Sequence, residues 1–286
     1  MAMNIAQLYI HPIKSLRSIP VQSITITPNG LQHDRTFILV RILPDGAIKN
    51  MTIKETSELC LFQPTLSPDG QSISVFFTPM PSAPPITIPL EPVITPETKS
   101  YEINIFSTAA TGYDVGSEFA LFFSNHLGYP VRLVYIGRNQ RSTHPAIAPP
   151  TTSTPHPQGI AFADAAPILV STRASLDDVA ARQGGVFDLT KFRSNIFVAT
   201  PDGATAYDEE LWAQVEVGET PVRLTMTFNT VRCQSINVDY ETGKLMPAGE
   251  QIYKKMTKDR RINPYFPFRP CFGRYAFCEQ FGRFPL

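Results

Sequence analysis

The distribution of proline is the sequence feature that most limits how this chain can fold. Of the 27 prolines, seven lie between Pro79 and Pro96 and five lie between Pro145 and Pro157. Proline fixes φ and removes a backbone donor, so both stretches are expected to be loops or extended connectors. The second stretch is also rich in Ser and Thr, and we expect a mobile loop or a linker there.

The residues before the first proline-rich stretch carry the pattern of short strands. Residues 21–27 alternate apolar and polar side chains, which is the period of a half-buried strand. A turn at 28–30 leads into an apolar strand at 36–40, and residues 72–77 repeat the pattern. Several short strands separated by turns predict a small barrel or sandwich over roughly residues 1–100.

Helices and further strands are predicted in the rest of the chain. Residues 118–127 stop at Gly128, and residues 175–182 start with Ser175 at capping-box spacing from Asp178. Further strands are expected at 195–199, 222–228 and 235–239.

The fold class is therefore mostly β with a few helices (α+β), with one β-barrel-like domain packed on another. The expected domains are residues 1–100, a helix and proline-rich connector at 101–158, and a second domain at 159–286.

Charge and hydropathy exclude several classes of protein. Lys and Arg number 25, as do Asp and Glu, so no general field attracts nucleic acid or an anionic membrane. No run of about twenty apolar residues is present, so no membrane span is expected. The first residues lack the pattern of a secretory or organelle signal, and a cytoplasmic location is expected.

The cysteines have to be judged one by one. No CxxC pair or HxxxH pair is present, so a closed structural zinc site is not expected. A disulfide framework is not expected in a reducing compartment. Three of the four cysteines are expected to pack in the core: Cys60, Cys271 and Cys278.

Two short clusters in the first part of the chain could bind phosphate. Lys14 and Ser15 follow an apolar strand and offer a point charge and a hydroxyl, although a solvated strand end is the commoner reading. Arg35, oriented by Asp34, could bind phosphate with two parallel hydrogen bonds, although a surface ion pair is the commoner reading.

Two clusters in the second part could bind a heterocycle and a metal. Arg193 and Asn195 lie two residues apart, so they would share a face of a strand beginning near them, and a structural role for Asn195 is equally plausible. Cys233 follows Arg232, a cation that favours the thiolate form, which ligates metals or attacks electrophiles. Burial as a small apolar side chain is the alternative for this cysteine.

Taken in order, these motifs resemble the MOSC (molybdenum cofactor sulfurase C-terminal) family with its N-terminal β-barrel domain. The resemblance runs through HPIKSL, GLQHDRTFILV, FRSNIFV, VRCQSINVDYETGK and PCFGRY, across nearly the whole chain. The functional relatives that the chain resembles are the mitochondrial amidoxime-reducing component and the C-terminal domain of molybdenum cofactor sulfurases.

The resemblance implies a molybdenum cofactor (molybdopterin) and a role for each motif. Lys14, Ser15 and Arg35 would hold the phosphate of the pterin, and Arg193 and Asn195 would contact the pterin itself. Cys233 would be the protein ligand to molybdenum and the catalytic residue, with Arg232 beside it in the cofactor site. Pyridoxal phosphate binding is a further property implied at the level of the family.

The resemblance also implies an activity and partners. The leading hypothesis is a molybdenum-dependent reductase of small N-oxygenated compounds, such as hydroxylamines or amidoximes. Its electrons would come from a haem cytochrome and a flavin reductase. One alternative is a carrier of the cofactor or of sulfur without turnover. Another is a metal-free transferase with Cys233 as the nucleophile.

Two departures from the family pattern carry expectations of their own. Relatives have small hydroxyl residues where this chain has Asp164-Ala165-Ala166-Pro167, so cofactor contacts there are expected to be weaker or made by backbone. Relatives continue past the equivalent of Leu286, so a less complete C-terminal barrel is expected.

The hypothesis also makes a geometric prediction. The candidate residues from both halves should converge on one pterin-sized, locally positive cleft, with the other three cysteines outside it.

Overall fold

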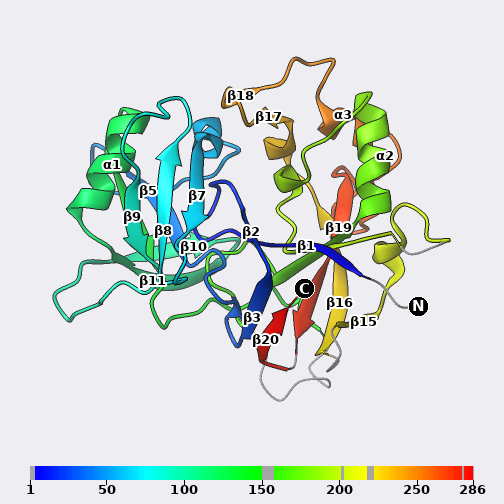
Figure 1. The fold of residues 1–286 in the computed structure, drawn as a ribbon, viewed down its shortest axis with the longest axis horizontal. Coiled ribbons are helices and arrows are strands. Elements are labelled where there is room, and N and C mark those ends of the chain that lie inside the picture. The colour runs from blue at the N-terminus through cyan, green and yellow to red at the C-terminus, as the bar shows by residue number, and fades with distance from the viewer. Residues whose placement is uncertain (1–3, 150–157, 201–202, 218–221, 279, 286) are drawn as a thin grey trace.

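The computed structural model describes residues 4–149, 158–200, 203–217, 222–278 and 280–285 as two lobes (Figure 1). Strands make up 37% of the described residues, which also contain three α-helices, and this confirms the expected class. The part of the proline-rich stretch at 150–157 lies outside the described residues. No described helix has the length and apolar character needed to cross a membrane.

The first lobe contains two antiparallel sheets and a helix. One sheet has the order β10-β11-β12-β5-β6 and the other has the order β7-β8-β9. The elements of this lobe are β5 (Phe37–Ile42), β6 (Ile48–Asn50), the 3-10 helix η1 (Ser57–Leu61), β7 (Phe62–Leu66), β8 (Ser72–Phe77), β9 (Ile86–Pro89), β10 (Ser100–Ile105), β11 (Thr108–Asp114), α1 (Ser117–Leu127) and β12 (Val131–Tyr135). The expected connector at 101–158 thus supplies strands to this lobe in addition to its helix.

The second lobe is built on a seven-stranded sheet of order β15-β16-β19-β13-β14-β1-β2. Its neighbouring strands are antiparallel except β13 and β14, which are parallel. These strands are β1 (Ile5–Ile10), β2 (Ile19–Val21), β13 (Ile168–Thr172), β14 (Ile196–Val198), β15 (Gln214–Val217), β16 (Val222–Val231) and β19 (Cys271–Cys278). The N-terminal strand therefore crosses into the sheet of the second lobe (Figure 1).

Smaller elements complete this lobe. They are β3 (Ser23–Thr27), β4 (Gly30–Leu31) and β20 (Gly282–Pro285) in a three-stranded sheet, β17 (Val238–Asp239) and β18 (Lys244–Leu245) in a hairpin, the helices α2 (Arg173–Gln183) and α3 (Ile252–Met256), and the 3-10 helices η2 (Leu189–Phe192), η3 (Asp208–Leu211) and η4 (Gln234–Asn237). Because β20 pairs with β3, the end of the described chain also joins a strand from its beginning.

The helix ends agree with the sequence more closely at the C-terminus than at the N-terminus. Gly128 and Gly184 end α1 and α2 in the left-handed conformation, as predicted. The start of α2 was predicted wrongly, because the Thr172 side chain, not that of Ser175, accepts a hydrogen bond and caps the helix. The strand expected at 235–239 is also wrong in its first half, where η4 forms.

One hydrophobic core spans both lobes. Buried side chains of the first lobe, such as Phe37 and Phe62, belong to the same cluster as Leu8, Ile168 and Leu224 of the seven-stranded sheet. The three cysteines expected in the core are fully buried: Cys60, Cys271 and Cys278. The lobes therefore share packing as well as strands.

Candidate functional site

Lys14 and Ser15 lie at a buried turn after β1. The backbone N–H of Lys14 donates to the Phe37 carbonyl at 2.8 Å, which ties this turn to the start of β5. Lys14 is 8% exposed, and its Nζ donates to the Phe162 carbonyl at 2.9 Å and pairs with the carboxylate of Asp164. Burial lowers the pKa of Lys14, and the Asp164 charge opposes that change. The lysine is therefore no solvated strand end.

Arg35 and Asp34 form a buried ion pair. Their side chains are 12% and 1% exposed, which rules out the surface pair considered from the sequence. Asp34 Oδ1 accepts hydrogen bonds from the His11 N–H at 2.8 Å and from Asn195 Nδ2 at 3.2 Å. Burial alone would raise the pKa of the Asp34 carboxyl, but Arg35 and His11 outweigh it and lower the pKa to about 2.

Asn195 joins Arg35 to the second lobe. Its Oδ1 accepts from Arg35 Nη1 at 3.2 Å and from the Leu169 N–H at 3.1 Å, and its Nδ2 also donates to the Tyr9 carbonyl at 3.3 Å. Because both ends of this buried amide bond to protein groups, Asn195 positions Arg35. This geometry favours the structural role that the sequence left open.

Arg193 is placed next to Arg35 by the backbone, and not by a shared strand face. It follows η2 in the left-handed conformation with φ of 59°, and β14 begins only at Ile196, so the predicted strand face is wrong. Arg35 Nη2 donates to the Arg193 carbonyl at 3.0 Å. Arg193 Nη1 donates to the Leu16 carbonyl at 2.6 Å, whereas its buried Nη2 has no hydrogen-bond partner among the described residues.

Three of the candidate residues share a strained backbone. Ser15, Arg35 and Arg193 have φ of 72°, 51° and 59°, a region that costs energy for residues other than glycine. Such strain persists where surrounding contacts fix it, and it gathers at functional sites. This strain could not be predicted from the sequence, because none of the three residues is a glycine.

Cys233 follows β16 at the other end of this region. It is partly exposed, and its Sγ lies 2.9 Å from Ser235 Oγ. Arg232 is buried beside it, donating from Nη2 to the Phe192 carbonyl at 2.9 Å, while its Nε has no partner among the described residues. Cys233 is therefore a partly exposed residue, and it follows in sequence a cation with an unused donor.

Tyr275 on β19 links the two ends of the site. Burial raises the pKa of Tyr275 to about 12, with a further increase from Asp164 and Cys233 and opposite effects from Arg232 and Arg35. The pKa of Tyr275 therefore responds to charged groups from both halves of the chain. Its hydroxyl stays protonated at neutral pH and remains a hydrogen-bond donor.

The charges of this region do not balance. Two carboxylates, Asp34 and Asp164, face a larger group of cations: Lys14, Arg35, Arg141, Arg193 and Arg232. Burial and the charges of Arg35 and Arg193 lower the pKa of His11 far below its usual value, so its ring adds no charge at neutral pH. The neutral chain thus concentrates positive charge where an anion would be stabilised.

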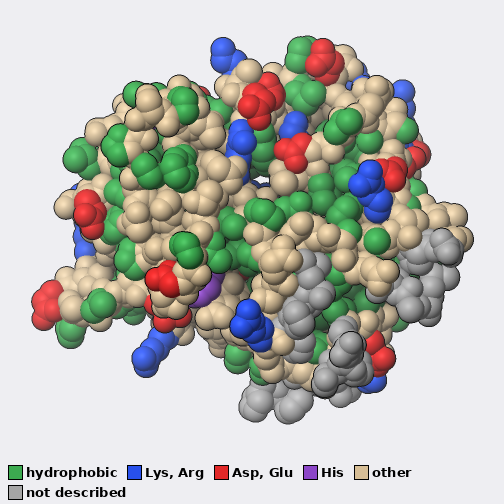
Figure 2. Space-filling model, viewed as in Figure 1, with side chains coloured by type: hydrophobic (Ala, Val, Ile, Leu, Met, Phe, Trp, Pro, Cys, Tyr) green, Lys and Arg blue, Asp and Glu red, His purple; other side chains and the backbone are tan. Residues whose placement is uncertain are grey.

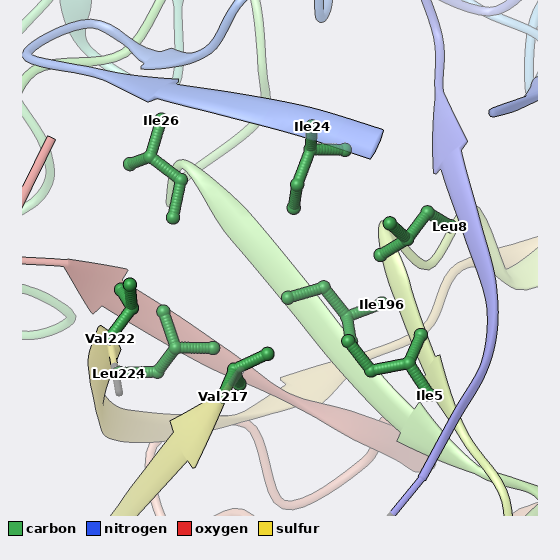
Figure 3. A pocket seen from close by; sticks show the side chains of 8 residues that line it. All are labelled: Ile5, Leu8, Ile24, Ile26, Ile196, Val217, Val222 and Leu224. Carbon is green, nitrogen blue, oxygen red and sulfur yellow. The ribbon is translucent and has the colours of Figure 1, made fainter. Parts of the chain in front are cut away.

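The predicted pterin-sized cleft does not correspond to the pocket that Figure 3 shows. No group of three His, Cys, Asp or Glu side chains that could hold a metal ion occurs among the described residues. The pocket in Figure 3 is lined by eight aliphatic side chains, none of which is a candidate site residue: Ile5, Leu8, Ile24, Ile26, Ile196, Val217, Val222 and Leu224. A narrow opening between the two lobes is visible in Figure 2.

Comparison with protein families identifies the family of the chain. The MOSC N-terminal beta barrel domain matches residues 2–130, and the MOSC domain matches residues 157–283. The chain belongs to the MOSC family. In this MOSC protein, the two matched parts contribute Lys14 and Arg35 on one side and Arg193 and Cys233 on the other.

Curated relatives of this MOSC protein are similar over most of its length. The mitochondrial amidoxime-reducing component 1 of Homo sapiens is 27% identical over 290 residues, covering 98% of this chain and 80% of its own. The mitochondrial amidoxime reducing component 2 of Macaca fascicularis is 29% identical over 294 residues, with the same coverage. A molybdenum cofactor sulfurase of Drosophila mojavensis is 26% identical over 249 residues, which are 85% of this chain and 29% of that protein.

Several residues of the site were missed by reasoning from the sequence. Arg141 and Tyr275 were not singled out, and Asp164 was considered only as a departure from the family pattern. Tyr275 lies in the quoted motif PCFGRY, which was a signal that could have found it. Arg141 had none, because its partners are backbone carbonyls at 105, 108, 161 and 163 that only the folded chain brings together.

Proposed function

We propose that this MOSC protein is a molybdenum-cofactor-dependent reductase of N-oxygenated compounds. One observation carries the proposal: Arg35 and Arg232 donate to the adjacent backbone carbonyls of Arg193 and Phe192, so the excess cations and the partly exposed Cys233 belong to one region. An anionic group with a soft metal at one end fits this distribution of charge and sulfur. The names of the curated relatives support the same chemistry.

The unused donors of the site provide a test of whether the cofactor fits. Arg193 Nη2 and Arg232 Nε are buried without a partner among the described residues, and buried polar atoms of this kind are rarely left unpaired. A phosphate and a pterin edge would accept hydrogen bonds from such donors. We therefore assign Lys14, Ser15, Arg35, Arg193 and Arg232 to binding the cofactor, with Asn195 holding Arg35 in place and Cys233 ligating molybdenum.

The chain's own groups bind and orient in this proposal. When bound, the cofactor supplies two-electron redox chemistry at molybdenum. The cations would neutralise its phosphate, and the Tyr275 hydroxyl stays protonated and can donate a hydrogen bond. Overall, a hydroxylamine, two electrons and two protons give an amine and water, so the N–O bond breaks and nitrogen is reduced. The electrons are proposed to come from a partner, a haem cytochrome with its flavin reductase, which are the donors that the family resemblance implies.

The deciding experiment measures metal and turnover together. The protein, purified from a host that makes the cofactor, should contain molybdenum close to equimolar with the chain and should reduce a hydroxylamine with a chemical reductant. Cys233→Ser should lose the activity and retain less metal, whereas Cys60→Ala, a buried thiol outside the site, should keep both. Full activity of Cys233→Ser would sink the proposal.

The same assay separates the alternatives. A carrier of the cofactor would contain molybdenum but show no turnover with the chemical reductant. A metal-free transferase would need a base beside its nucleophile, and the hydrogen-bond partner of Cys233 is the Ser235 hydroxyl, not a histidine.

A further inference from the structure

A closed loop of residues 261–270 is attached directly to the Cys233 motif. Its two ends meet where the Cys271 N–H donates to the Arg260 carbonyl at 2.8 Å. The Arg232 N–H donates to the Pro270 carbonyl at 2.7 Å, so the base of the loop lies against the residue that precedes Cys233. Compact loops with adjacent ends are frequently functional.

The loop presents aromatic side chains to solvent. Tyr265 is 69% exposed and Phe268 is 79% exposed. The Tyr265 ring stacks on the buried Phe228 with 6.0 Å between ring centroids, and Asn263 Nδ2 donates to the Asn229 carbonyl at 3.0 Å. These contacts hold the loop on β16, so its exposed rings are presented by an anchored structure.

The chain segment that forms α3 and the loop is strongly basic. Around α3 and the loop, five cations that are exposed or partly exposed have no ion pair among the described residues: Lys254, Lys255, Lys258, Arg261 and Arg269. By contrast, the neighbouring Asp259 and Arg260 are already paired with Arg182 and Glu210. Unpaired positive charge in a chain of net charge zero is a local feature that favours an acidic partner.

Tyr253 on α3 relates this surface to the thiol. The Tyr253 N–H donates to Asn237 Oδ1 at 3.0 Å, and Asn237 belongs to η4, whose N-cap is Cys233. The helix α3 therefore packs against the turn that follows Cys233. A protein seated on the loop would lie beside the thiol.

We propose that α3 and the loop 261–270 form the docking surface for an acidic electron-donor protein. This inference rests on the proposed reductase function and specifies the partner surface that it requires. Exposed Tyr, Phe and Arg are the residues that supply binding energy at protein interfaces, and the cations steer an acidic partner to them. Reduction of one substrate takes two electrons, so a one-electron haem donor is oxidised from Fe(II) to Fe(III) in each of two successive encounters.

The test measures binding and electron delivery separately. The probes are the soluble domain of a b-type haem cytochrome with net negative charge and a c-type cytochrome with net positive charge. Binding to the full chain is titrated at low and high salt, and reoxidation of the reduced haem is followed with a hydroxylamine present. We expect only the acidic probe to bind, with affinity that falls as salt rises.

Matched variants locate the surface. Lys254→Glu with Lys258→Glu should weaken binding at low salt by about ten-fold or more, while Lys99→Glu with Arg138→Glu, an equal charge change on the first lobe, should not. Phe268→Ala should weaken binding, and Phe106→Ala, an exposed phenylalanine of the first lobe, should leave it unchanged. Turnover with a chemical reductant should be normal in all four variants.

The outcomes distinguish this inference from the proposed function. If Lys254→Glu with Lys258→Glu and Phe268→Ala bind the acidic probe as tightly as the wild type, the docking surface is wrong even when chemical turnover is present. If the basic surface binds vesicles containing an anionic phospholipid but not the acidic cytochrome, it is a membrane-binding surface and the inference is overturned. Absence of molybdenum with intact, charge-dependent cytochrome binding would overturn the function and leave the surface standing.

Discussion

At the scale of single residues, the ion pair of Asp34 and Arg35 has two roles that can be measured separately. It is buried and bonded to Asn195 and His11, so it contributes to folding as well as to the charge of the site. Arg35→Ala leaves the Asp34 carboxylate buried without its main partner, which should lower the free energy of unfolding by about 3–5 kcal/mol. Urea denaturation measures this loss. Arg35→Lys keeps the charge but lacks the planar pair of donors, so its free energy of unfolding should fall by less than that of Arg35→Ala. Equal decreases in the two variants would contradict the role of the charge.

The depressed pKa of Asp34 makes a prediction about acid stability. Because the folded pKa is about 2 and that of an unfolded aspartate is about 3.9, the pair stabilises the fold above pH 4. That contribution, roughly 2–3 kcal/mol, should disappear as the pH falls through 2. Between pH 5 and pH 2, the free energy of unfolding should fall less steeply in Asp34→Asn than in the wild type. Parallel curves for the two proteins would exclude Asp34 as the source.

Lys14 allows cofactor binding to be tested with a smaller effect on the fold. Its partner Asp164 is 56% exposed and can be solvated when the lysine is removed. Lys14→Ala should therefore leave the fold nearly intact. It should weaken cofactor binding by about 1.5–3 kcal/mol, or roughly ten-fold or more in affinity, because one charge-assisted hydrogen bond is lost. Molybdenum content after dilution and gel filtration measures this loss. Unchanged retention would remove Lys14 from the phosphate site.

At the scale of elements, local signals predicted local structure well. The strand β8 and the glycine ends of α1 and α2 follow from side-chain alternation and from glycine's access to positive φ. The incorrect predictions concern features that depend on partners distant in the sequence. The Thr172 side chain caps α2 while also bonding to the buried carboxylate of Glu209, a residue 37 positions away. The pairing of β1 with β14 joins residues about 190 positions apart, and no periodicity in either strand specifies that partner.

The same limit applies to the candidate site. The motif residues could be identified because their chemistry is local: a cation, a hydroxyl, or a thiol beside an arginine. The exact role of Asn195 could not be predicted, because its four hydrogen-bond partners come from three separate parts of the chain.

One glycine sets the close approach between β13 and β19, the strands that carry Leu169 and Tyr275. Gly273 has φ of 74°, and an added Cβ would lie 2.7 Å from the Val170 carbonyl oxygen. Gly273→Ala should thus lower the free energy of unfolding by about 2 kcal/mol or more, from backbone strain and from the clash. It should also reduce molybdenum retention, because it displaces Tyr275. Gly249→Ala, where nothing lies within 4 Å, is the matched control, and equal behaviour of the two variants would contradict the role of Gly273.

At the scale of the molecule, the two parts matched by the MOSC domains do not form two independent units. The N-terminal strand β1 lies in the sheet of the second lobe, β20 lies beside β3, and a single apolar cluster continues through both lobes. The site crosses the same junction, because Arg35 of the first matched part donates to the Arg193 carbonyl and to Asn195 of the second. Binding across this junction should therefore stabilise the whole molecule at once.

This continuity predicts a single cooperative thermal transition. Calorimetry of the cofactor-free protein should give one peak, with a calorimetric enthalpy equal to the van't Hoff enthalpy. Asn195→Ala leaves buried groups on both sides of the junction unpaired, at about 1–3 kcal/mol for each, so the single peak should move down by several degrees without splitting. Loading with the cofactor should move it up, because a ligand that binds only the folded state adds to its stability. Phe106→Ala, on the solvent-facing surface of the first lobe, should leave the temperature unchanged. Two resolved peaks in the wild type or in Asn195→Ala would mean that the lobes unfold independently. The shared core would then not couple them.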